Sequence, residues 1–403
     1  MSSLGKSYAN YLVYYFLSMV CNGTLRNHIV SEIDRNVVLQ KHEFMLDDFL
    51  GKMNDQAEGF MRKFLGDDEL ECKVEFKSLK RKRSVLFELR KIEVENPNKK
   101  GLTDNPLSHA HQPYELCIDS SPRIQLPSLE YAQLYIDREI QLLFLGEFIY
   151  RAVILPPGRG AFAGENFSVK SEVASSMNMY NNFFRDYDFG LNPRIQVKRE
   201  GDDDLSSRLL RLTSGGRLIS IEGKQFLQLD ETKKIALSAG ASSVKDLSPW
   251  LFYLKNHRIM PCAFCLEEPE AHQHPSITVQ IADVMAIAMH RRGASLIHLT
   301  THSDYLIQRF NQLIKLGSIR RKNRELFRHI CKERKLDPYA YLDAKDVHAY
   351  YFSKNEKGKT VVETLQVTDD GIPMKSFFDV VSDLGEREEY INAAIYRMNK
   401  EQV

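Results

Sequence analysis

Cysteine is scarce in this sequence, and the few that occur do not form a metal or disulfide framework. Six cysteines are scattered among 403 residues, a usage that suits the reducing cytoplasm, where we expect the protein. Only Cys262 and Cys265 form a CxxC pair, and no second CxxC or histidine pair completes a zinc site. Because both lie within an apolar run, we expect them to be buried strand residues rather than metal or redox groups.

The chain also lacks a charge imbalance and a long hydrophobic run. Its 55 Lys and Arg against 54 Asp and Glu give a net charge of +1, so nothing global points to nucleic acid or membranes. The apolar run 11–20 resembles the core of a signal peptide, but it is too short to cross a bilayer and no small-residue cleavage site follows it. We therefore expect a buried helix there and no membrane partner. No internal repeat is present, and no heptad run is long enough for coiled-coil arms.

What the sequence does contain is a regular alternation of helices and strands in its second half. Apolar periodicity predicts helices at 243–255, 276–291 and 304–316, separated by strands at 261–266 and 296–301. Such alternation predicts a parallel sheet with crossover helices.

The first half and the last part of the chain are more mixed. The patterns predict helices at 41–65, 129–148 and 169–189, strands at 72–76, 84–89 and 151–155, a loop-rich insert at 96–127, a hairpin at 217–229, strands at 347–352 and 361–367, and a closing helix.

Gly5-Lys6-Ser7 indicates a phosphate loop near the start of the chain. In the pattern GxxxxGK[ST], backbone N–H groups at a helix N-terminus cradle phosphates, the lysine neutralises their oxygens and the hydroxyl binds magnesium. The first glycine of the pattern would fall one position before Met1, and the strand that should precede it is absent too. We expect an in-frame extension upstream that encodes both.

Two adjacent carboxylates, Glu267 and Glu268, end the apolar run 262–266. We expect Glu267 to hold magnesium, directly or through water, and Glu268 to polarise the attacking water. The next apolar run ends in His302, which suits phosphate sensing. Ligands of open α/β sheets bind at the carboxyl ends of neighbouring strands, where these side chains would meet. The alternative is a pair of solvated carboxylates.

Leu237-Ser238-Ala239-Gly240 precedes a predicted helix and the acidic strand. A Ser-x-Gly turn at a helix N-terminus can cradle a phosphate, and the alternative is an ordinary helix cap. The order of the motifs favours the phosphate cradle.

Four histidines invite other interpretations. His272 and His274 form an HxH pair, but further ligands are missing in sequence, so we expect a structural loop. We expect His290 and His298 to be packing or surface residues.

Taken in order, these motifs resemble those of ABC-type ATPases. The matching stretches are Gly5-Lys-Ser7, Leu237-Ser-Ala-Gly240, Leu266-Glu-Glu-Pro-Glu-Ala-His-Gln-His-Pro275 and Thr301-His-Ser-Asp-Tyr-Leu306. They most resemble the OLD-like "AAA family" ATPases of bacterial anti-phage defence, such as Septu-type and PARIS-type ATPases. The stretch 154–160 looks like a Pro-x-Gly/Ser-Arg strand end of this group. Arg159 is therefore expected to approach nucleotide or the dimer partner, with a plain loop arginine as the alternative.

The resemblance implies a head-to-head homodimer, or a higher homo-oligomer, that sandwiches two ATP molecules with Mg²⁺. Ser238 and Gly240 of one subunit would reach the γ-phosphate held by the other subunit's Gly5, Lys6, Ser7, Glu267, Glu268 and His302. Binding would close the dimer and hydrolysis would release it. Many OLD-like proteins carry a Toprim nuclease, but no DxD-centred acidic constellation follows His302. We therefore expect an ATPase switch that controls an effector nuclease from a neighbouring gene.

The predicted fold is accordingly a P-loop NTPase of the ABC-ATPase type, with a mostly parallel sheet, flanking helices, and an antiparallel β and helical insert. We divide it into the phosphate loop and first helix (1–40), the insert (41–235), and the part with the other three motifs, the C-terminal strands and the last helix (236–403).

Two other functions stay open. Basic clusters at 80–83 and 320–335 would suit a RecF-like DNA-repair ATPase, although Glu325 and Glu333 interrupt the second cluster and favour a solvated face. A non-catalytic scaffold with a truncated phosphate loop is the third hypothesis.

Overall fold

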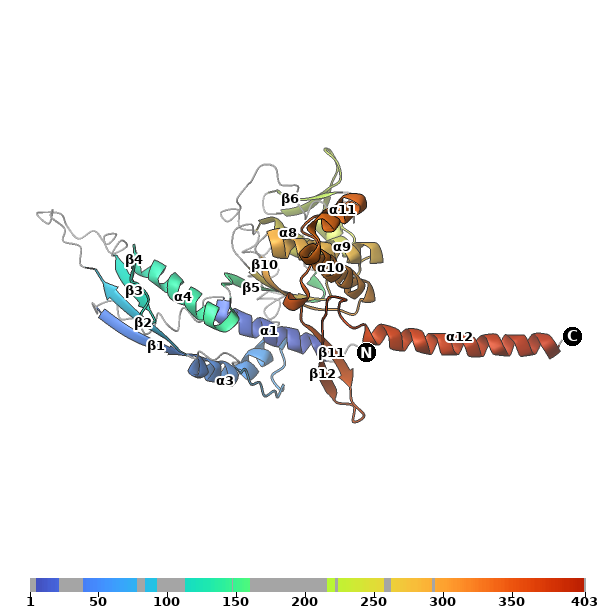
Figure 1. Ribbon diagram of the computed structural model, residues 1–403, viewed down its shortest axis with the longest axis horizontal. Helices are drawn as coiled ribbons and strands as arrows, with labels where there is room; N and C mark the ends of the chain where they lie inside the picture. The colour runs from blue at the N-terminus through green and yellow to red at the C-terminus, as the bar shows by residue number, and fades with distance from the viewer. Residues whose placement is uncertain are drawn as a thin grey trace, which may run out of the picture.

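The computed structural model describes residues 5–21, 39–77, 84–92, 113–146, 148–159, 216–221, 224–256, 262–291 and 294–401. Within them the molecule is elongated, with an antiparallel sheet near one end, an α/β body in the middle and a long C-terminal helix at the other end (Figure 1).

Three parallel strands form the centre of the α/β body. They are β5 (Arg151–Leu155), β9 (Cys262–Glu267) and β10 (Ala294–Thr300), hydrogen-bonded in the order β10-β9-β5. Every residue of the central strand β9 is buried, as expected for a parallel strand that is covered on both faces. The crossover from β9 to β10 is helix α9 (Pro275–Arg291). The predicted α/β alternation with a parallel sheet is confirmed in this part of the chain.

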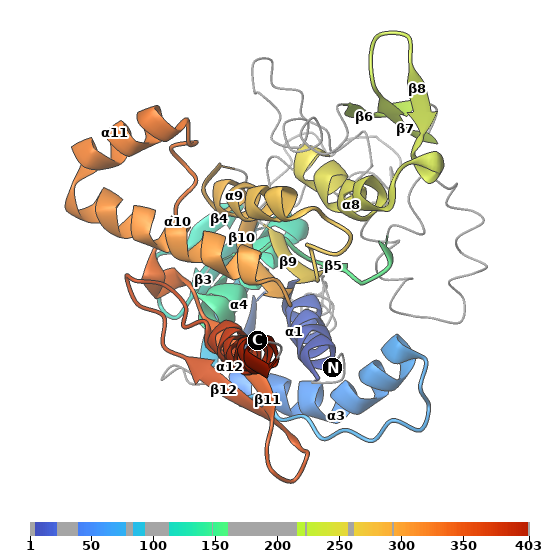
Figure 2. The ribbon, with the colours of Figure 1, turned by 90° about the vertical axis from the view of Figure 1, so that its right-hand side faces the viewer.

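Alternate side chains of these strands enter two different cores. Val153 and Phe264 join the core formed with α8 (Ser242–Asn256), α9 and α10 (Asp304–Lys322). Ile154, Ala263 and Cys265 join the core on the side of α1 (Lys6–Cys21). In Figure 2, α1 lies on one side of this sheet and α9 and α10 lie on the other. The sheet is therefore sandwiched between helices.

Helix α1 is a buried helix, as predicted for the apolar run near the N-terminus. Tyr14, Tyr15 and Leu17 are at most 2% exposed, and the Tyr15 hydroxyl donates to the carbonyl oxygen of Met53 at 2.8 Å. Burial of each such side chain contributes about 1.5–3 kcal/mol. Burial also raises the pKa of Tyr15 to about 12. This packing fixes the helix whose first turn carries Lys6 and Ser7.

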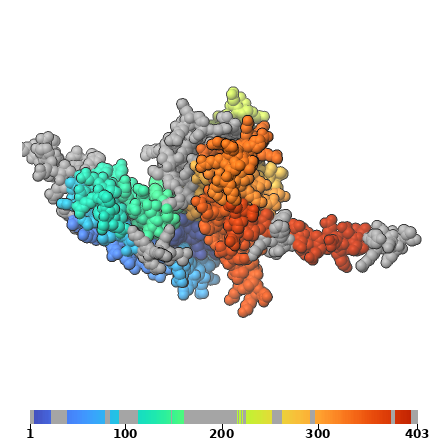
Figure 3. Space-filling view, in the orientation of Figure 1, coloured from blue at the N-terminus to red at the C-terminus, as the bar shows by residue number. Residues whose placement is uncertain are grey.

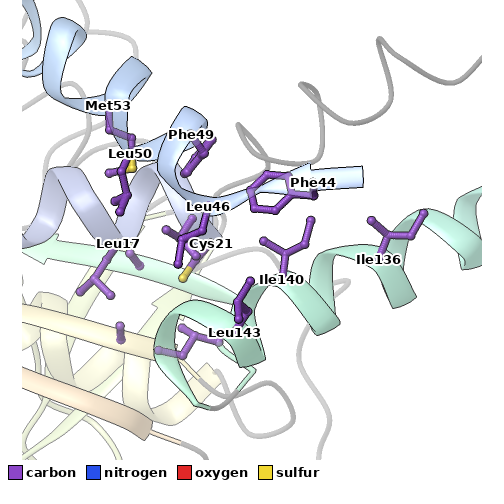
Figure 4. Packing of buried hydrophobic residues seen from close by; sticks show 14 of the residues in the cluster. Leu17, Cys21, Phe44, Leu46, Phe49, Leu50, Met53, Ile136, Ile140 and Leu143 are labelled. Atoms are coloured by element: carbon purple, nitrogen blue, oxygen red, sulfur yellow. The ribbon is translucent and has the colours of Figure 1, made fainter. Parts of the chain in front are cut away.

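An antiparallel sheet and two helices extend this second core. They are β1 (Leu39–Met45), β2 (Ser84–Lys91), β3 (Tyr114–Ile118), β4 (Ile124–Leu126), α3 (Leu46–Leu65) and α4 (Leu129–Leu145), with the strands in the order β1-β2-β3-β4. Leu17 and Cys21 of α1 belong to the same buried cluster as Leu46, Leu50 and Leu143 of α3 and α4 (Figure 4). The antiparallel sheet is thus joined to α1 through α3 and α4.

The remaining elements lie at the margin of the α/β body. They are the antiparallel sheet of β6 (Arg217–Ile221), β7 (Lys224–Gln228) and β8 (Lys234–Ala236), the 3-10 helices Leu237–Ala239 and Ala344–Asp346, α11 (Arg324–Arg334), the hairpin of β11 (Ala349–Lys354) and β12 (Thr360–Leu365), and α12 (Lys375–Glu401). Helix α12 extends away from the body (Figure 3). Among the residues that the structure describes, no helix has the length and apolarity that a membrane span requires.

Two predictions for the first half were wrong, and sheet pairing explains both. Residues 41–45 are not helical but belong to β1, which pairs with β2, and the helix begins at Leu46. Residues 72–76 form no strand. Strand β2 is paired with β1 on one edge and with β3 on the other, so residues 72–76 have no free edge of β2 to pair with. Instead, the Phe76 amide donates to the Asn54 side chain at 2.6 Å.

The loop-rich insert was also predicted incorrectly at its end, because β3 and β4 form at 114–118 and 124–126. The strand at 84–89, the helix that begins at Leu129, the strand at 151–155 and the hairpin at 217–229 are confirmed. The predicted helix at 169–189 and the basic cluster at 80–83 lie outside the described residues. The division into three parts stays a prediction.

Candidate nucleotide-binding site

The acidic pair and the histidine meet because β9 and β10 end at the same level. Glu267 is the register partner of Thr300, and the Glu268 amide donates to the Thr300 carbonyl oxygen at 3.0 Å. Glu268 and His302, which follow the two strands, therefore lie side by side at the carboxyl edge of the sheet. Open α/β folds bind ligands at this edge.

The first turn of α1 faces this edge. Gly5 has a φ of +75°, a left-handed conformation that favours glycine, and the Ala9 amide donates to its carbonyl oxygen at 3.0 Å. Lys6 Nζ lies 3.2 Å from the Thr301 carbonyl oxygen and 3.1 Å from His302 Nδ1. Burial lowers the pKa of Lys6, and the carboxylates of Glu268 and Glu270 oppose that shift. An incoming phosphate would therefore compete with the Thr301 carbonyl oxygen and His302 for the ammonium group of Lys6.

Glu267 is held by two hydroxyl groups of α1. The Ser7 hydroxyl donates to one carboxylate oxygen, and the Tyr11 hydroxyl donates to the other at 2.7 Å. Only 4% of Glu267 is exposed. The sequence interpretation missed Tyr11, although its position one helical turn after Ser7 puts both residues on one face of α1.

Glu268 differs from its neighbour in being accessible. It has a φ of +43°, which for a residue other than glycine costs about 1–3 kcal/mol and is typical of functional sites. Its side chain is 41% exposed, and Oε1 lies 3.5 Å from Nε2 of His302, which is 47% exposed. The two adjacent carboxylates therefore have distinct environments, one buried against α1 and one open to water.

Glu270 connects the loop after β9 to the loop after β10. Its Oε1 accepts hydrogen bonds from the Thr301 hydroxyl at 2.5 Å and from the His302 amide at 2.8 Å. Its other carboxylate oxygen is buried and has no hydrogen-bond partner among the described residues. The sequence interpretation assigned no role to Glu270, and its only signal was its place in the acidic motif. The contacts indicate a positioning residue that fixes the backbone of His302.

We expect Glu270→Ala to lower kcat for nucleotide hydrolysis about 10- to 100-fold while nucleotide affinity changes little, because misplacing a reacting group by about 1 Å costs this much. Glu270→Gln, which keeps a carbonyl acceptor, should retain most activity. Steady-state kinetics and equilibrium titration of each variant separate the two quantities. Equal damage from Gln and Ala would show that the charge of Glu270 matters rather than its hydrogen bonds.

Arg159 is a buried link between three elements. Its Nε donates to the Asp246 carbonyl oxygen at 2.8 Å, and Nη1 donates to those of Pro156 at 3.1 Å and Glu267 at 2.8 Å. Burial lowers its pKa, and Asp246, Glu270 and nearby carboxylates oppose the shift. With 4% exposure, Arg159 fixes the ends of β5 and β9 against α8. Its predicted contact with nucleotide or a dimer partner stays a prediction.

The Leu237–Gly240 turn lies at the start of α8. Leu237 is buried, Ser238 is exposed and Gly240 is half-buried. The Gly240 amide donates to the Leu237 carbonyl oxygen at 3.0 Å. In the described part of the chain, no hydrogen bond joins Ser238 to Lys6, Ser7 or the acidic pair. The structure therefore leaves the Ser238 hydroxyl accessible, and its role at a nucleotide stays a prediction.

Gln273 ties the loop after the acidic pair to α8, because its side-chain amide donates to the Ser243 carbonyl oxygen at 2.9 Å. His274 contacts the hydroxyl of Ser276 at 2.8 Å, at the start of α9. These contacts make 271–276 a structured loop, as expected for the HxH pair. The described residues contain no group of three or more metal-binding side chains of the His, Cys, Asp and Glu types.

The other histidines and the CxxC pair pack as predicted. His298 Nδ1 lies 2.8 Å from the Asn10 side-chain oxygen, and burial lowers the pKa of His298. The ring of His290 stacks on Tyr341 with centroids 4.1 Å apart. Cys262 and Cys265 are buried in opposite cores on the two faces of β9, so they cannot chelate one metal ion.

The residues at this edge fit Mg²⁺ and a nucleotide phosphate. Magnesium prefers oxygen ligands, and the Ser7 hydroxyl and Glu267 carboxylate are already in contact. Bound there, the ion would neutralise phosphate charge. Lys6 and the N-terminus of α1 supply a cation and backbone donors for phosphate oxygens.

Comparisons with known proteins add a structural likeness only. No protein-family model and no curated protein matches the chain. Among solved structures, it is similar to the crystal structure of an SmcHead bound to the C-winged helix domain of ScpA, with 12% identity over 91% of this chain and 88% of that chain and a TM-score of 0.35. A second similar structure comes from work on ATP-driven dimerization and DNA-stimulated activation of SMC ATPases, with 13% identity over 51% of this chain and 96% of that chain and a TM-score of 0.27. Both TM-scores are low, so the function is inferred from the residues of the site.

Proposed function

We propose that this chain binds and hydrolyses ATP with Mg²⁺ in an ABC-type dimer. The observation that carries the proposal is the joint contact of Ser7 with Glu267 and of Lys6 with His302, which brings the first turn of α1 to the ends of β9 and β10 at one sheet edge. Exposed Glu268 lies beside His302. A lysine, a hydroxyl and two carboxylates in distinct environments are the groups that phosphoryl transfer to water requires.

Each residue has a defined task in this proposal. Lys6 binds the terminal phosphates, and Ser7 with Glu267 holds the magnesium ion. Glu268 accepts a proton from the attacking water, and its 41% exposure gives water access to it. His302 contacts the γ-phosphate. Ser238 is exposed at the start of α8 and contacts the γ-phosphate bound by the other subunit, which completes the site.

Mixing two inactive variants tests the dimer. In a head-to-head dimer, Lys6→Ala chains combined with Ser238→Arg chains regain one wholly native site in each mixed dimer. Random mixing should restore about a quarter of native ATP hydrolysis, measured as phosphate release. The matched control combines Lys6→Ala with Glu268→Gln, which lie on the same half-site, and should restore nothing. Absence of recovery in the first mixture would exclude a site shared between subunits.

We further propose that ATP-driven closure controls an effector nuclease from a neighbouring gene in anti-phage defence, which is what the resemblance to OLD-like ATPases implies. The chain should co-purify with that effector, and ATP should alter the effector's activity. If Glu268→Gln leaves the control of the effector unchanged, this part of the proposal fails, whereas ATP hydrolysis by the chain alone would still stand.

A further inference from the structure

Helix α11 carries a row of cations along one side. Arg324, Arg328 and Lys332 follow one another at intervals of four residues, and all three are exposed. Residues four apart on an α-helix lie one above the other, and the rise of about 1.5 Å per residue makes this row about 12 Å long. Lys335 follows at the C-terminal cap.

The row is held on a rigid support. Phe327 and Cys331, on another side of α11, are 5% and 8% exposed and belong to the core of the α/β body. The Asn323 side chain caps the helix by accepting from the Leu326 amide at 2.9 Å. Because the apolar side of α11 is buried in its own protein, the cationic side is left facing solvent.

The cations at the end of α10, just before the row in sequence, already have partners. Arg321 and Lys322 of α10 pair with Asp369, and Arg321 also pairs with Asp343. The guanidinium of Arg320 lies 4.3 Å from the centre of the Tyr341 ring. Among the described residues, no ion pair is found for the three cations of the row. Helical spacing puts Glu325 at its edge and Glu333 farther around the helix.

The basic cluster 320–335 of the sequence therefore divides into cations of α10 that have partners and cations of α11 that face solvent. Arg320 and Arg321 are structural residues, although they appeared there as equivalent to Arg324. The row does not reflect a general excess of positive charge, because the whole chain has a net charge of only +1. The row therefore concentrates unpaired positive charge at one place on the molecule.

We propose that the α11 row binds the phosphate backbone of double-stranded DNA. Phosphates follow one another at about 3.4 Å of helix axis along each strand, so a row of this length spans about three or four of them. Single strands are bound through stacking on aromatic side chains, but α11 exposes no Phe, Tyr or Trp. Contacts of cations with phosphates position a protein on a duplex and carry no sequence information. The contact is thus electrostatic and independent of base sequence.

Salt-dependent binding tests this surface in the full-length chain without nucleotide, so the outcome is independent of ATP hydrolysis. A fluorescent duplex of about 30 base pairs is titrated at several NaCl concentrations, and the slope of log K against log salt counts the phosphates neutralised. The triple variant Arg324→Ala, Arg328→Ala, Lys332→Ala should bind about 10- to 100-fold more weakly and lose a slope of about 2.7. Its thermal melting point should match that of the native chain.

A matched variant controls for net charge. Lys354, Lys357 and Lys359 of the β11–β12 hairpin are exposed, and replacing all three by Ala removes the same charge. Native affinity in this control, with loss in the α11 variant, supports the proposal. Equal loss in both variants, or no loss in the α11 variant, overturns it. Tighter binding to duplex RNA, or to vesicles containing anionic lipid, also overturns the assignment to DNA.

Discussion

Glu268→Gln should lower the rate of ATP hydrolysis about 100- to 1,000-fold, within the range that a general base contributes. Glutamine keeps the shape of the side chain but cannot accept the proton of the attacking water. ATP affinity should stay within about threefold of native, because Glu268 is 41% exposed and, among the residues that the structure describes, no hydrogen bond joins it to Lys6 or Ser7. Phosphate release under single-turnover conditions and equilibrium titration with ATP measure the two quantities.

The same variant should accumulate as an ATP-bound dimer, since closure needs binding and reopening needs hydrolysis. Light scattering with and without ATP measures this. Glu389→Gln is the matched control, because Glu389 is an exposed glutamate of the projecting helix α12 and should behave like the native chain. Hydrolysis by Glu268→Gln within threefold of native would assign the base to another residue.

Lys6→Ala should weaken ATP binding about 10- to 100-fold, because a charge-assisted hydrogen bond contributes about 1.5–3 kcal/mol and each 1.4 kcal/mol is a factor of ten. Lys6 Nζ contacts the Thr301 carbonyl oxygen and His302 Nδ1, and the oxygens of bound phosphates would replace these partners of the ammonium group. Isothermal titration with ATP and Mg²⁺ measures the affinity.

Lys315→Ala controls for the loss of one positive charge, since Lys315 is an exposed lysine of α10 outside the site. Lys6→Arg should not restore binding, because a planar guanidinium cannot replace a compact ammonium group in a loop that encloses phosphate. Unchanged ATP affinity in Lys6→Ala would refute the phosphate loop and would favour a non-catalytic scaffold.

Secondary structure and burial were predicted best from the sequence where they depend on one element alone. The continuous apolar run 262–266 indicated a strand buried on both faces, and the apolar run after Ser7 indicated a buried helix; both are found. Prediction of a strand failed where the result depends on which strands pair with one another. Residues 72–76 have strand-like alternation, but β2 already has a partner on each edge. Alternation describes a strand's faces and cannot say whether an edge is free.

Site residues divide in the same way. Lys6, Ser7, Glu267, Glu268 and His302 were predicted as site residues because each belongs to a short motif with local spacing, and the structure places them at one sheet edge. Tyr11 and Glu270 were missed because each acts through a contact with a residue distant in sequence, at 2.7 Å to Glu267 and 2.8 Å to the His302 amide. Arg159 was expected to approach nucleotide or the dimer partner, or to be a plain loop arginine; its donors contact backbone carbonyl oxygens, and the approach to nucleotide or partner stays a prediction.

By itself, then, the sequence determined the chemistry available at this site: one lysine, one hydroxyl, two adjacent carboxylates and one histidine at the ends of predicted elements. The tertiary structure decided which of them are neighbours and which are exposed. Strands β9 and β10 end at the same level, which places Glu268 beside His302. Helix α1 buries Glu267 and leaves Glu268 exposed to solvent. The reason is physical: residue type fixes what a group can donate or accept, whereas burial and distance depend on strand register and helix packing, which join segments far apart in the chain.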